Sequence, residues 1–295
     1  DKDSLQEFRN RALNIEKPVI KGTSQNEDIY FQITEARNKY YEKLPDIVNS
    51  YMKEINKITG KNYKPFNYYG SPKATKIIIA MGSVCETIKE TVDYLTKKGE
   101  AVGLLEVHLY RPFSSKYFLQ ALPKTVKKIA VLDRTKEAGS IGEPLFLDVC
   151  KVVKEVSEKI KIYGGRYGLS GRNTTPAMIK GLFDFLDSKD CHTNFTLGID
   201  DDITNLSVMY DKKFLLPTTN TSFLVYGYGS DGMVSASKDL MKITGTYSKA
   251  FVQGYFQYDS KKSGGVTISH LRFGTAPIKS TYYVEKASLI VCTKD

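Results

Sequence analysis

The residues with the clearest chemical potential form a glycine-rich bend between an apolar strand and a helix. The apolar run Phe223–Gly227 leads into Gly227-Tyr-Gly-Ser-Asp-Gly232, and a helix-like segment follows. This order fits the G-x-G-x-x-G template, in which glycines let the backbone approach a pyrophosphate and the helix N-terminus offers N–H groups. Ordinary strand-to-helix turns also fit this template, so the bend alone indicates only a turn.

A second apolar run begins near Phe251 and ends in a loop that carries two lysines. In NAD sites an acidic residue roughly 20 positions after the glycines holds a ribose hydroxyl, and Asp259 lies a little farther along than that. Lys261 and Lys262 follow it, and cations there suit an extra phosphate on the ribose, as in NADP or the 3′-phospho-ADP portion of coenzyme A. The bend and the lysine pair together predict a phosphate-binding site.

The predicted site has three parts. Backbone contacts to phosphate are assigned to the bend, at Gly229, Ser230, Asp231 and Gly232. Charge pairing is assigned to Lys261 and Lys262, helped by Ser260 and Ser263, and Lys238 on the following helix is a further candidate. We predict no catalytic residue and no metal ligands in this chain.

Other polar groups are interpreted as structural. Gly82-Ser83 opens a helix and is interpreted as a simple N-cap. The mixed charges of 133–140 follow a strand and favour an internal ion-pair network or a domain contact over a catalytic pair. The three histidines have no metal-ligand spacing, and a hydrogen-bonded role is expected for each.

Composition narrows the class of protein. The chain has 295 residues, enough for about two domains, and a formal charge of +10. Its lysines are spread along the chain, so we expect no nucleic-acid binding; with no long apolar span, we also expect no membrane association and a cytoplasmic location. The chain opens on Asp1 and its last apolar strand stops near residue 292, which we interpret as a piece of a longer protein.

The fold class expected is α/β. Strands at 76–81, 101–109 and 128–133 alternate with helical stripes at 84–95, 145–160 and 178–186, which predicts a largely parallel sheet over 72–205. Residues 1–71 are a connecting segment with an amphipathic helix, 206–221 a linker, and 222–295 a partial Rossmann-like unit.

Long stretches of the chain resemble pyruvate:ferredoxin (flavodoxin) oxidoreductases. The resemblance rests on Gly229-Ser-Asp-Gly232, Gln253-Gly-Tyr-Phe256 and the block from Tyr258 to Gly274, which includes His-Leu-Arg-Phe-Gly. The same family is echoed, in order along the chain, by residues 22–31, 81–86, 109–113, 131–136, 141–144 and 197–205. The pattern of 72–205 also looks like the C-terminal domain of transketolases.

This resemblance implies a parent enzyme that converts pyruvate and coenzyme A to acetyl-CoA and CO2. Its thiamine diphosphate, Mg²⁺ and [4Fe–4S] clusters would be held by other domains, because this chain has neither a G-D-G…N-N signature nor a cysteine array. Residues 1–71 would lead from a thiamine domain, and 222–295 would begin the coenzyme A-binding domain. Implied partners are those other domains, a second copy in a homodimer, and ferredoxin, flavodoxin or a fused NADP-reducing module.

Two other functions stay open on the residues alone. The chain could be a non-catalytic nucleotide-binding or assembly module, or an NADP-dependent dehydrogenase that uses the bend Gly227–Gly232 directly. Taken by itself, the chain is expected to be inactive.

Overall fold

The computed structural model describes residues 1–12, 14–16, 18, 24–260 and 264–293. The chain forms two compact units, residues 1–47 and 48–295. The first unit contains the helices α1 (Lys2–Asn10) and α2 (Tyr30–Ala36) and the beginning of α3 (Asn38–Thr59). Pro45 lies inside α3, so the expected helix around it continues through the proline.

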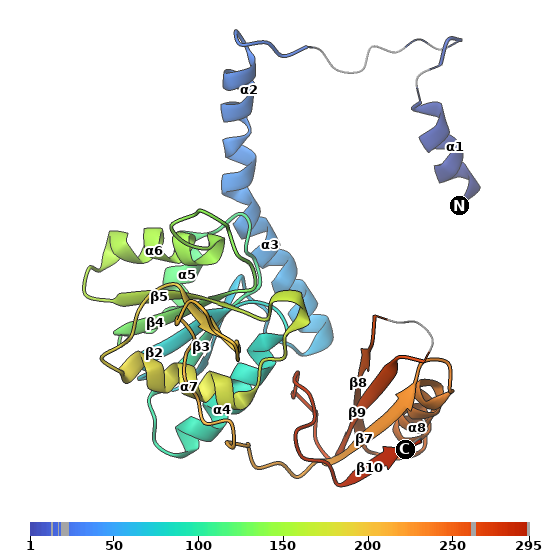
Figure 1. Ribbon diagram of the computed structural model, residues 1–295. Coiled ribbons are helices and arrows are strands. Elements are labelled where there is room, and N and C mark those ends of the chain that lie inside the picture. Colours follow the sequence, from blue (N-terminus) through green and yellow to red (C-terminus); the bar gives the residue numbers. More distant parts are fainter. Residues whose placement is uncertain (13, 17, 19–23, 261–263, 294–295) are drawn as a thin grey trace. The chain divides into compact units, whose positions relative to one another are not determined.

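The second unit is built around a six-stranded sheet and a four-stranded sheet (Figure 1). The strands of the larger sheet are β1 (Phe66–Gly70), β2 (Lys76–Ala80), β3 (Val102–Val107), β4 (Lys128–Asp133), β5 (Lys161–Tyr167) and β6 (Phe195–Leu197). They lie in the order β1-β3-β2-β4-β5-β6, and only β1 is antiparallel to its neighbour. The expected α/β fold with a largely parallel sheet is confirmed.

Helices cover both faces of this sheet (Figure 1). On one face α4 (Val84–Lys97) and α7 (Pro176–Asp187) pack on Ile78 and Leu104. On the other face α5 (Ser115–Ala121) and α6 (Pro144–Val156) pack on Ile77 and Ile79. Successive strand residues point to opposite faces, so an apolar run such as that of β2 is buried on both sides.

Three strands of the larger sheet were absent from the sequence-based prediction. β5 contains Gly164 and Gly165, and a Cβ on Gly165 would lie 2.0 Å from the ring of Phe195. Glycine there admits a large neighbour but weakens the strand pattern in the sequence. β6 is only three residues long, and β1 lies within 1–71, which we expected to connect two domains.

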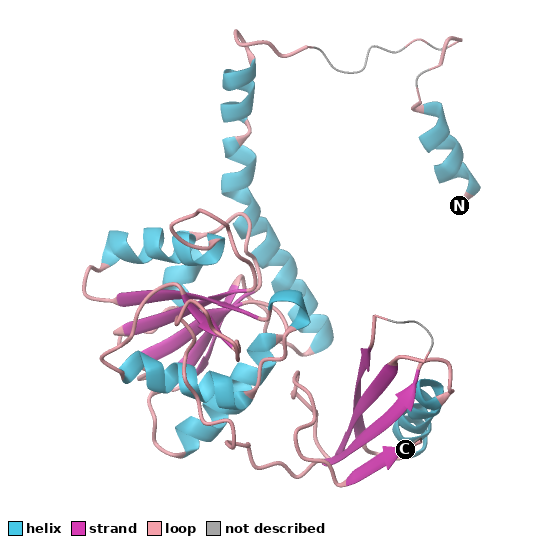
Figure 2. Ribbon diagram, viewed as in Figure 1, coloured by secondary structure: helices cyan, strands magenta, loops and turns pink. Residues whose placement is uncertain are grey.

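The smaller sheet consists of β7 (Thr221–Tyr228), β8 (Phe251–Tyr258), β9 (Val266–Gly274) and β10 (Leu289–Cys292), in the order β10-β7-β9-β8 (Figure 1). Figure 2 shows the strands of both sheets in magenta and the helices in cyan. Helix α8 (Met233–Tyr247) connects β7 to β8 and packs against both. β9 lies between these two strands and is antiparallel to each.

This order differs from the unit that the sequence suggests. In a Rossmann unit the strands on either side of the first helix are parallel neighbours. Here β9, a strand that the sequence-based prediction lacked, separates β7 from β8, and β10 pairs in parallel with β7. Among the described residues, no helix is long and apolar enough to cross a membrane.

Candidate functional site

The glycine bend follows β7 directly and begins α8, as the sequence predicts. Gly232 has φ +87°, a backbone conformation that residues with a side chain adopt at a cost. Gly227 is needed for space, because a Cβ there would lie 2.7 Å from the carboxylate of Asp231. The two glycines therefore shape the bend around one acidic side chain.

The carboxylate of Asp231 accepts hydrogen bonds from backbone N–H groups of its own bend. Its carboxylate accepts hydrogen bonds from the N–H of Tyr228 at 2.6 Å and of Met233 at 2.9 Å, and from the Thr293 hydroxyl at 3.3 Å. The two N–H donors hold the pKa of Asp231 below its ordinary value. The first N–H of α8 is thus occupied from within the chain.

The loop after β8 lies directly beside this bend. The N–H of Gly229 donates to the carbonyl of Gly265 at 2.8 Å, and the N–H of Gly264 approaches the carbonyl of Gly229 at 3.5 Å. The antiparallel pairing of β7 with β9 continues to Tyr228 and Val266, so the residues after Tyr228 lie close to those before Val266. Residues 35 and 36 positions apart in sequence are therefore adjacent in space.

The remaining predicted site residues are only partly described. Lys261, Lys262 and Ser263 lie outside the described residues. The Ser260 hydroxyl donates to Asp259 at 3.2 Å, and the Lys238 ammonium lies 5.4 Å from the ring centre of Phe256. Among described residues, the structure brings together the bend and the C-terminal end of the loop, at Gly264 and Gly265.

A buried polar network lies on β9, beyond the predicted site. His270 accepts the N–H of Val284 on Nδ1 at 3.0 Å, so its Nε2 donates to Gln257 at 2.7 Å. Burial, together with the nearby charge of Arg272, lowers the pKa of His270 to about 4. This histidine is neutral and hydrogen-bonded, which matches the role expected for it.

Arg272 in the same network is only 5% exposed. Its guanidinium donates to Gln253 at 3.0 Å and to the carbonyls of Ser280 at 3.3 Å and Tyr283 at 3.1 Å. Burial lowers its pKa. The sequence offered a signal for this role, an arginine within a strand that is mostly apolar or small, but it gave no sign of the groups that Arg272 contacts.

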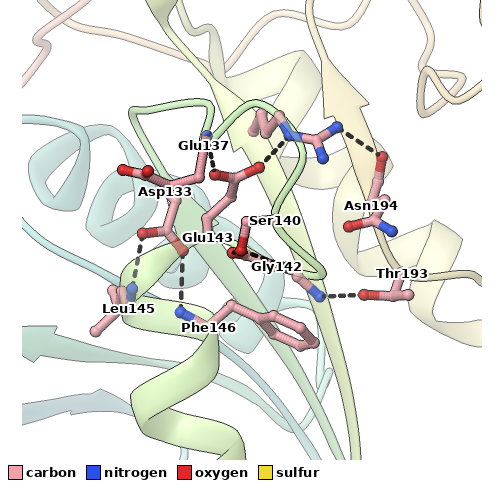
Figure 3. Close-up of polar contacts among 11 residues, drawn as sticks. Asp133, Glu137, Ser140, Gly142, Glu143, Leu145, Phe146, Thr193 and Asn194 are labelled. Atoms are coloured by element: carbon pink, nitrogen blue, oxygen red, sulfur yellow. Dashed lines mark hydrogen bonds and ion pairs between the residues drawn. The ribbon is translucent and has the colours of Figure 1, made fainter.

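The charged residues after β4 make hydrogen bonds within the chain, and the ion pair beside them lies just outside 133–140 (Figure 3). Asp133 accepts the N–H groups of Leu145 at 3.0 Å and Phe146 at 3.1 Å, at the beginning of α6. Glu143 pairs with Arg166 and also accepts the N–H of Glu137. Burial raises the pKa of Asp133. The carboxylates of Asp133 and Glu143 are thus held by partners within the chain, which indicates a structural role for both.

The interpretation of Ser83 as an N-cap needs a correction. Ser83 is the residue before α4, but it has helical backbone angles and its side chain makes no capping hydrogen bond. Cys85, in the first turn of α4, is buried, and burial raises the pKa of its thiol. Cys85 is therefore a packed, unreactive thiol.

Known proteins match the chain along its length. Core domain II of pyruvate:ferredoxin oxidoreductase matches residues 74–179, and pyruvate ferredoxin/flavodoxin oxidoreductase matches 222–295. The pyruvate-flavodoxin oxidoreductase of Enterobacter agglomerans is 51% identical over 100% of this chain, and the pyruvate:ferredoxin oxidoreductase of Moorella thermoacetica is 50% identical over 99%. A Cryptosporidium parvum protein named pyruvate dehydrogenase (NADP+) is 47% identical over 98% of the chain.

The aligned region covers a limited part of these relatives. The chain spans 25% of the length of the first two and 15% of the third. Both matched domains occur here in one chain, each on one of the two sheets, and sequence identity of about half extends between them. The chain belongs to the pyruvate:ferredoxin (flavodoxin) oxidoreductase family.

Proposed function

We propose that this chain is a central portion of an enzyme that oxidatively decarboxylates pyruvate to acetyl-CoA and CO2. Electrons pass to ferredoxin or flavodoxin, or to NADP+ through a fused module, as the names of the relatives suggest for those proteins. Thiamine diphosphate, Mg²⁺ and the iron–sulfur clusters belong to other domains of the parent chain. The parent is a homodimer in the cytoplasm or in an organelle of anaerobic energy metabolism.

The portion present here contributes coenzyme A binding and a scaffold. Residues 1–71 connect to a thiamine domain, 72–205 form a transketolase C-terminal-like domain, 206–221 a linker and 222–295 the first part of the coenzyme A domain. The six-stranded sheet with helices on both faces supports the second assignment. The β7–bend–α8–β8 connection supports the last one, although β9 lies between the two strands.

One observation carries the coenzyme A assignment: backbone hydrogen bonds join Gly229 to Gly264 and Gly265. They hold the glycine bend against the C-terminal end of the loop that contains Lys261 and Lys262. Among described residues, the N–H groups of Ser230 and Gly232 have no hydrogen-bond acceptor, and an anionic phosphate oxygen supplies one. Lysine ammonium groups then pair with the same phosphate, helped by Ser260, Ser263 and Lys238.

The test replaces both lysines in the full-length enzyme. We expect Lys261→Ala with Lys262→Ala to raise the KM for coenzyme A at least fivefold, about 1 kcal/mol, and to leave the KM for pyruvate unchanged. Another lysine pair, Lys97→Ala with Lys98→Ala at the end of α4, is the matched control and should change neither value. Unchanged coenzyme A kinetics in the first variant would remove the lysine pair from the site.

Two other functions predict different ligands. A non-catalytic nucleotide-binding or assembly module has no preference for coenzyme A, and an NADP-dependent dehydrogenase binds NADPH at the bend. Titration of the chain with coenzyme A, NADPH and NADH separates them, because only the proposed function predicts tightest binding of coenzyme A. Tighter binding of NADPH would favour the dehydrogenase.

A further inference from the structure

The larger sheet has a topological switch point between β2 and β4. From β2 the chain passes through α4 to β3 on one side, whereas β4, β5 and β6 continue on the other side of β2. The helices after β2 and β4 cover opposite faces, so their connecting segments diverge above the sheet. In open α/β sheets ligands bind in the crevice that this divergence leaves at the carboxyl ends of the strands.

A cavity of about 110 Å³ lies at this point. It is lined by the beginning of α4, the ends of β4 and β5, the segment 171–174 and the segment 281–283, and Tyr255 of β8 reaches it. Two arginines line it, Arg134 and Arg172, and no aspartate or glutamate is among its described lining residues. A lining with two arginines and no acidic residue favours binding of an anion.

Hydrogen-bond donors without acceptors converge on the cavity. The Ser83 hydroxyl makes no capping bond, and Arg134 uses only its Nε, which donates to the carbonyl of Gly168 at 2.9 Å. Asn173 accepts the N–H of Tyr283 at 3.1 Å on its oxygen, so its amide NH₂ is the remaining group. Within the described chain, neither this NH₂ nor the terminal nitrogens of Arg134 have a partner.

The two arginines differ in whether a carboxylate pairs with their charge. Arg172 donates to Asp200 and to the carbonyl of Gly198, so its charge is already paired. Arg134 has no carboxylate partner among the described residues, and it follows β4 directly at the switch point. The beginning of α4, a helix of 14 residues, adds the positive end of its dipole. An anion in the cavity would neutralise the positive charge of Arg134.

The segment 281–283 borders the cavity. The Thr281 hydroxyl donates to the carbonyl of Ser83 at 2.7 Å and lies 2.8 Å from the Thr87 hydroxyl. The cavity is partly open to solvent, and its lining groups Ser83 and Arg134 are exposed, so an anion can reach them from outside.

We propose that this cavity binds a phosphate group, either free phosphate or the terminal phosphate of a larger ligand. Arg134 supplies the charge, and Ser83 and Asn173 supply hydrogen bonds. The site lies on the larger sheet and is separate from the bend at 229–232, so it does not depend on coenzyme A binding.

Calorimetric titration of the chain with inorganic phosphate tests the proposal, with chloride at equal ionic strength as the reference. We expect saturable binding, at least tenfold weaker in Arg134→Gln and weaker to a smaller degree in Ser83→Ala. Lys124→Gln also removes one positive charge, but it does so before β4, at the opposite end of the strand from Arg134. This variant should bind phosphate as the unaltered chain does. Circular dichroism confirms that each variant is folded, and thermal unfolding in phosphate gives a second measure of binding.

Two further arms separate the alternatives. If phenyl phosphate binds as tightly as inorganic phosphate, the cavity takes the terminal phosphate of a larger ligand. If inorganic phosphate alone binds, the cavity takes a free anion. Both results support the cavity. Loss of phosphate binding in Lys261→Ala with Lys262→Ala, but not in Arg134→Gln, assigns it to the glycine bend and overturns the proposal. Absence of saturable binding overturns it as well.

Discussion

At the scale of single residues, the bend after β7 is organised by Asp231. Its carboxylate accepts hydrogen bonds from two N–H groups of the bend, so the bend already holds one negatively charged side chain of its own. Gly227 leaves room for that carboxylate, and Gly232 turns the chain into α8 with a positive φ. The glycines of the motif thus have a structural task here as well as a proposed one in binding.

Substitution of Gly232 measures the cost of its backbone conformation. Because a Cβ at φ +87° meets no atom within 4 Å, Gly232→Ala introduces backbone strain without a clash. We expect a loss of about 1–2 kcal/mol in the free energy of unfolding, measured by urea titration. Asn tolerates this conformation better, so Gly232→Asn should lose less. Equal losses in the two variants would contradict this account.

His270 predicts a pH dependence of stability. Its pKa is about 4 in the folded chain and near 6.5 when unfolded, so the unfolded state takes up the proton first as pH falls. The stabilising contribution is complete above pH 6.5, declines between pH 6.5 and pH 4, and levels off below. We expect His270 to account for a loss of about 2 kcal/mol over this range.

The measurement compares urea unfolding at pH 7 and pH 4.5 for the chain and for His270→Gln. Glutamine cannot take up the proton, so this variant should lose less stability on acidification. An identical pH dependence in both proteins would show that His270 does not titrate as its burial and the Arg272 charge imply.

At the scale of elements, the connection from β4 to α6 depends on Asp133. This side chain is 5% exposed and accepts the first free N–H groups of α6, which places the helix N-terminus at the end of the strand (Figure 3). A helix end needs such acceptors when water is excluded. Glu143 and Arg166 hold the intervening loop in the same way.

Asp133→Ala leaves two N–H groups without acceptors. We expect it to lower the free energy of unfolding by about 3 kcal/mol, since each buried donor left unsatisfied costs about 1–3 kcal/mol. The control is Asp148→Ala, which removes a partly exposed carboxylate paired with Arg111 at 2.6 Å and should cost less than 1 kcal/mol. Chemical denaturation gives both values, and similar losses would argue against the capping role.

At the scale of the whole molecule, the segment 275–288 joins the two sheets of the second unit. The Glu90 carboxylate of α4 accepts the hydroxyls of Ser280 at 2.8 Å and Tyr282 at 3.0 Å. From the other side, Arg272 and His270 of β9 bond the same segment. The proposed phosphate cavity is lined in part by residues 281–283 of this segment, so its shape depends on these contacts.

Glu90→Ala should loosen the segment without unfolding either sheet. Hydrogen bonds to a charged group contribute about 1.5–3 kcal/mol, so we expect the amide hydrogens of Tyr283 and Val284 to exchange at least tenfold faster. Glu155→Ala, which removes an exposed partner of Lys151, should leave these rates unchanged. Hydrogen exchange followed by mass spectrometry makes the comparison, and unaltered protection in Glu90→Ala would exclude Glu90 as an anchor.

Local sequence was sufficient for most elements of this chain. β4 has the residues expected for it, and α4, α7 and β8 differ from their predicted ranges by a few positions, because periodicity and end signals act over a few residues. The motifs also led to the family. Strands without such a pattern were missed: β5 carries two glycines, and β9 alternates small polar residues with His270 and Arg272.

Only the tertiary structure decided which strands are neighbours and which polar groups meet. It inserts β9 between β7 and β8, and it joins Gly229 to Gly265 and Glu90 to Tyr282, which are 36 and 192 positions apart. Strand order and such pairings follow from burying both faces of a sheet at once, which no local stretch of sequence encodes. The phosphate cavity belongs to the same category, since its lining comes from six separate segments.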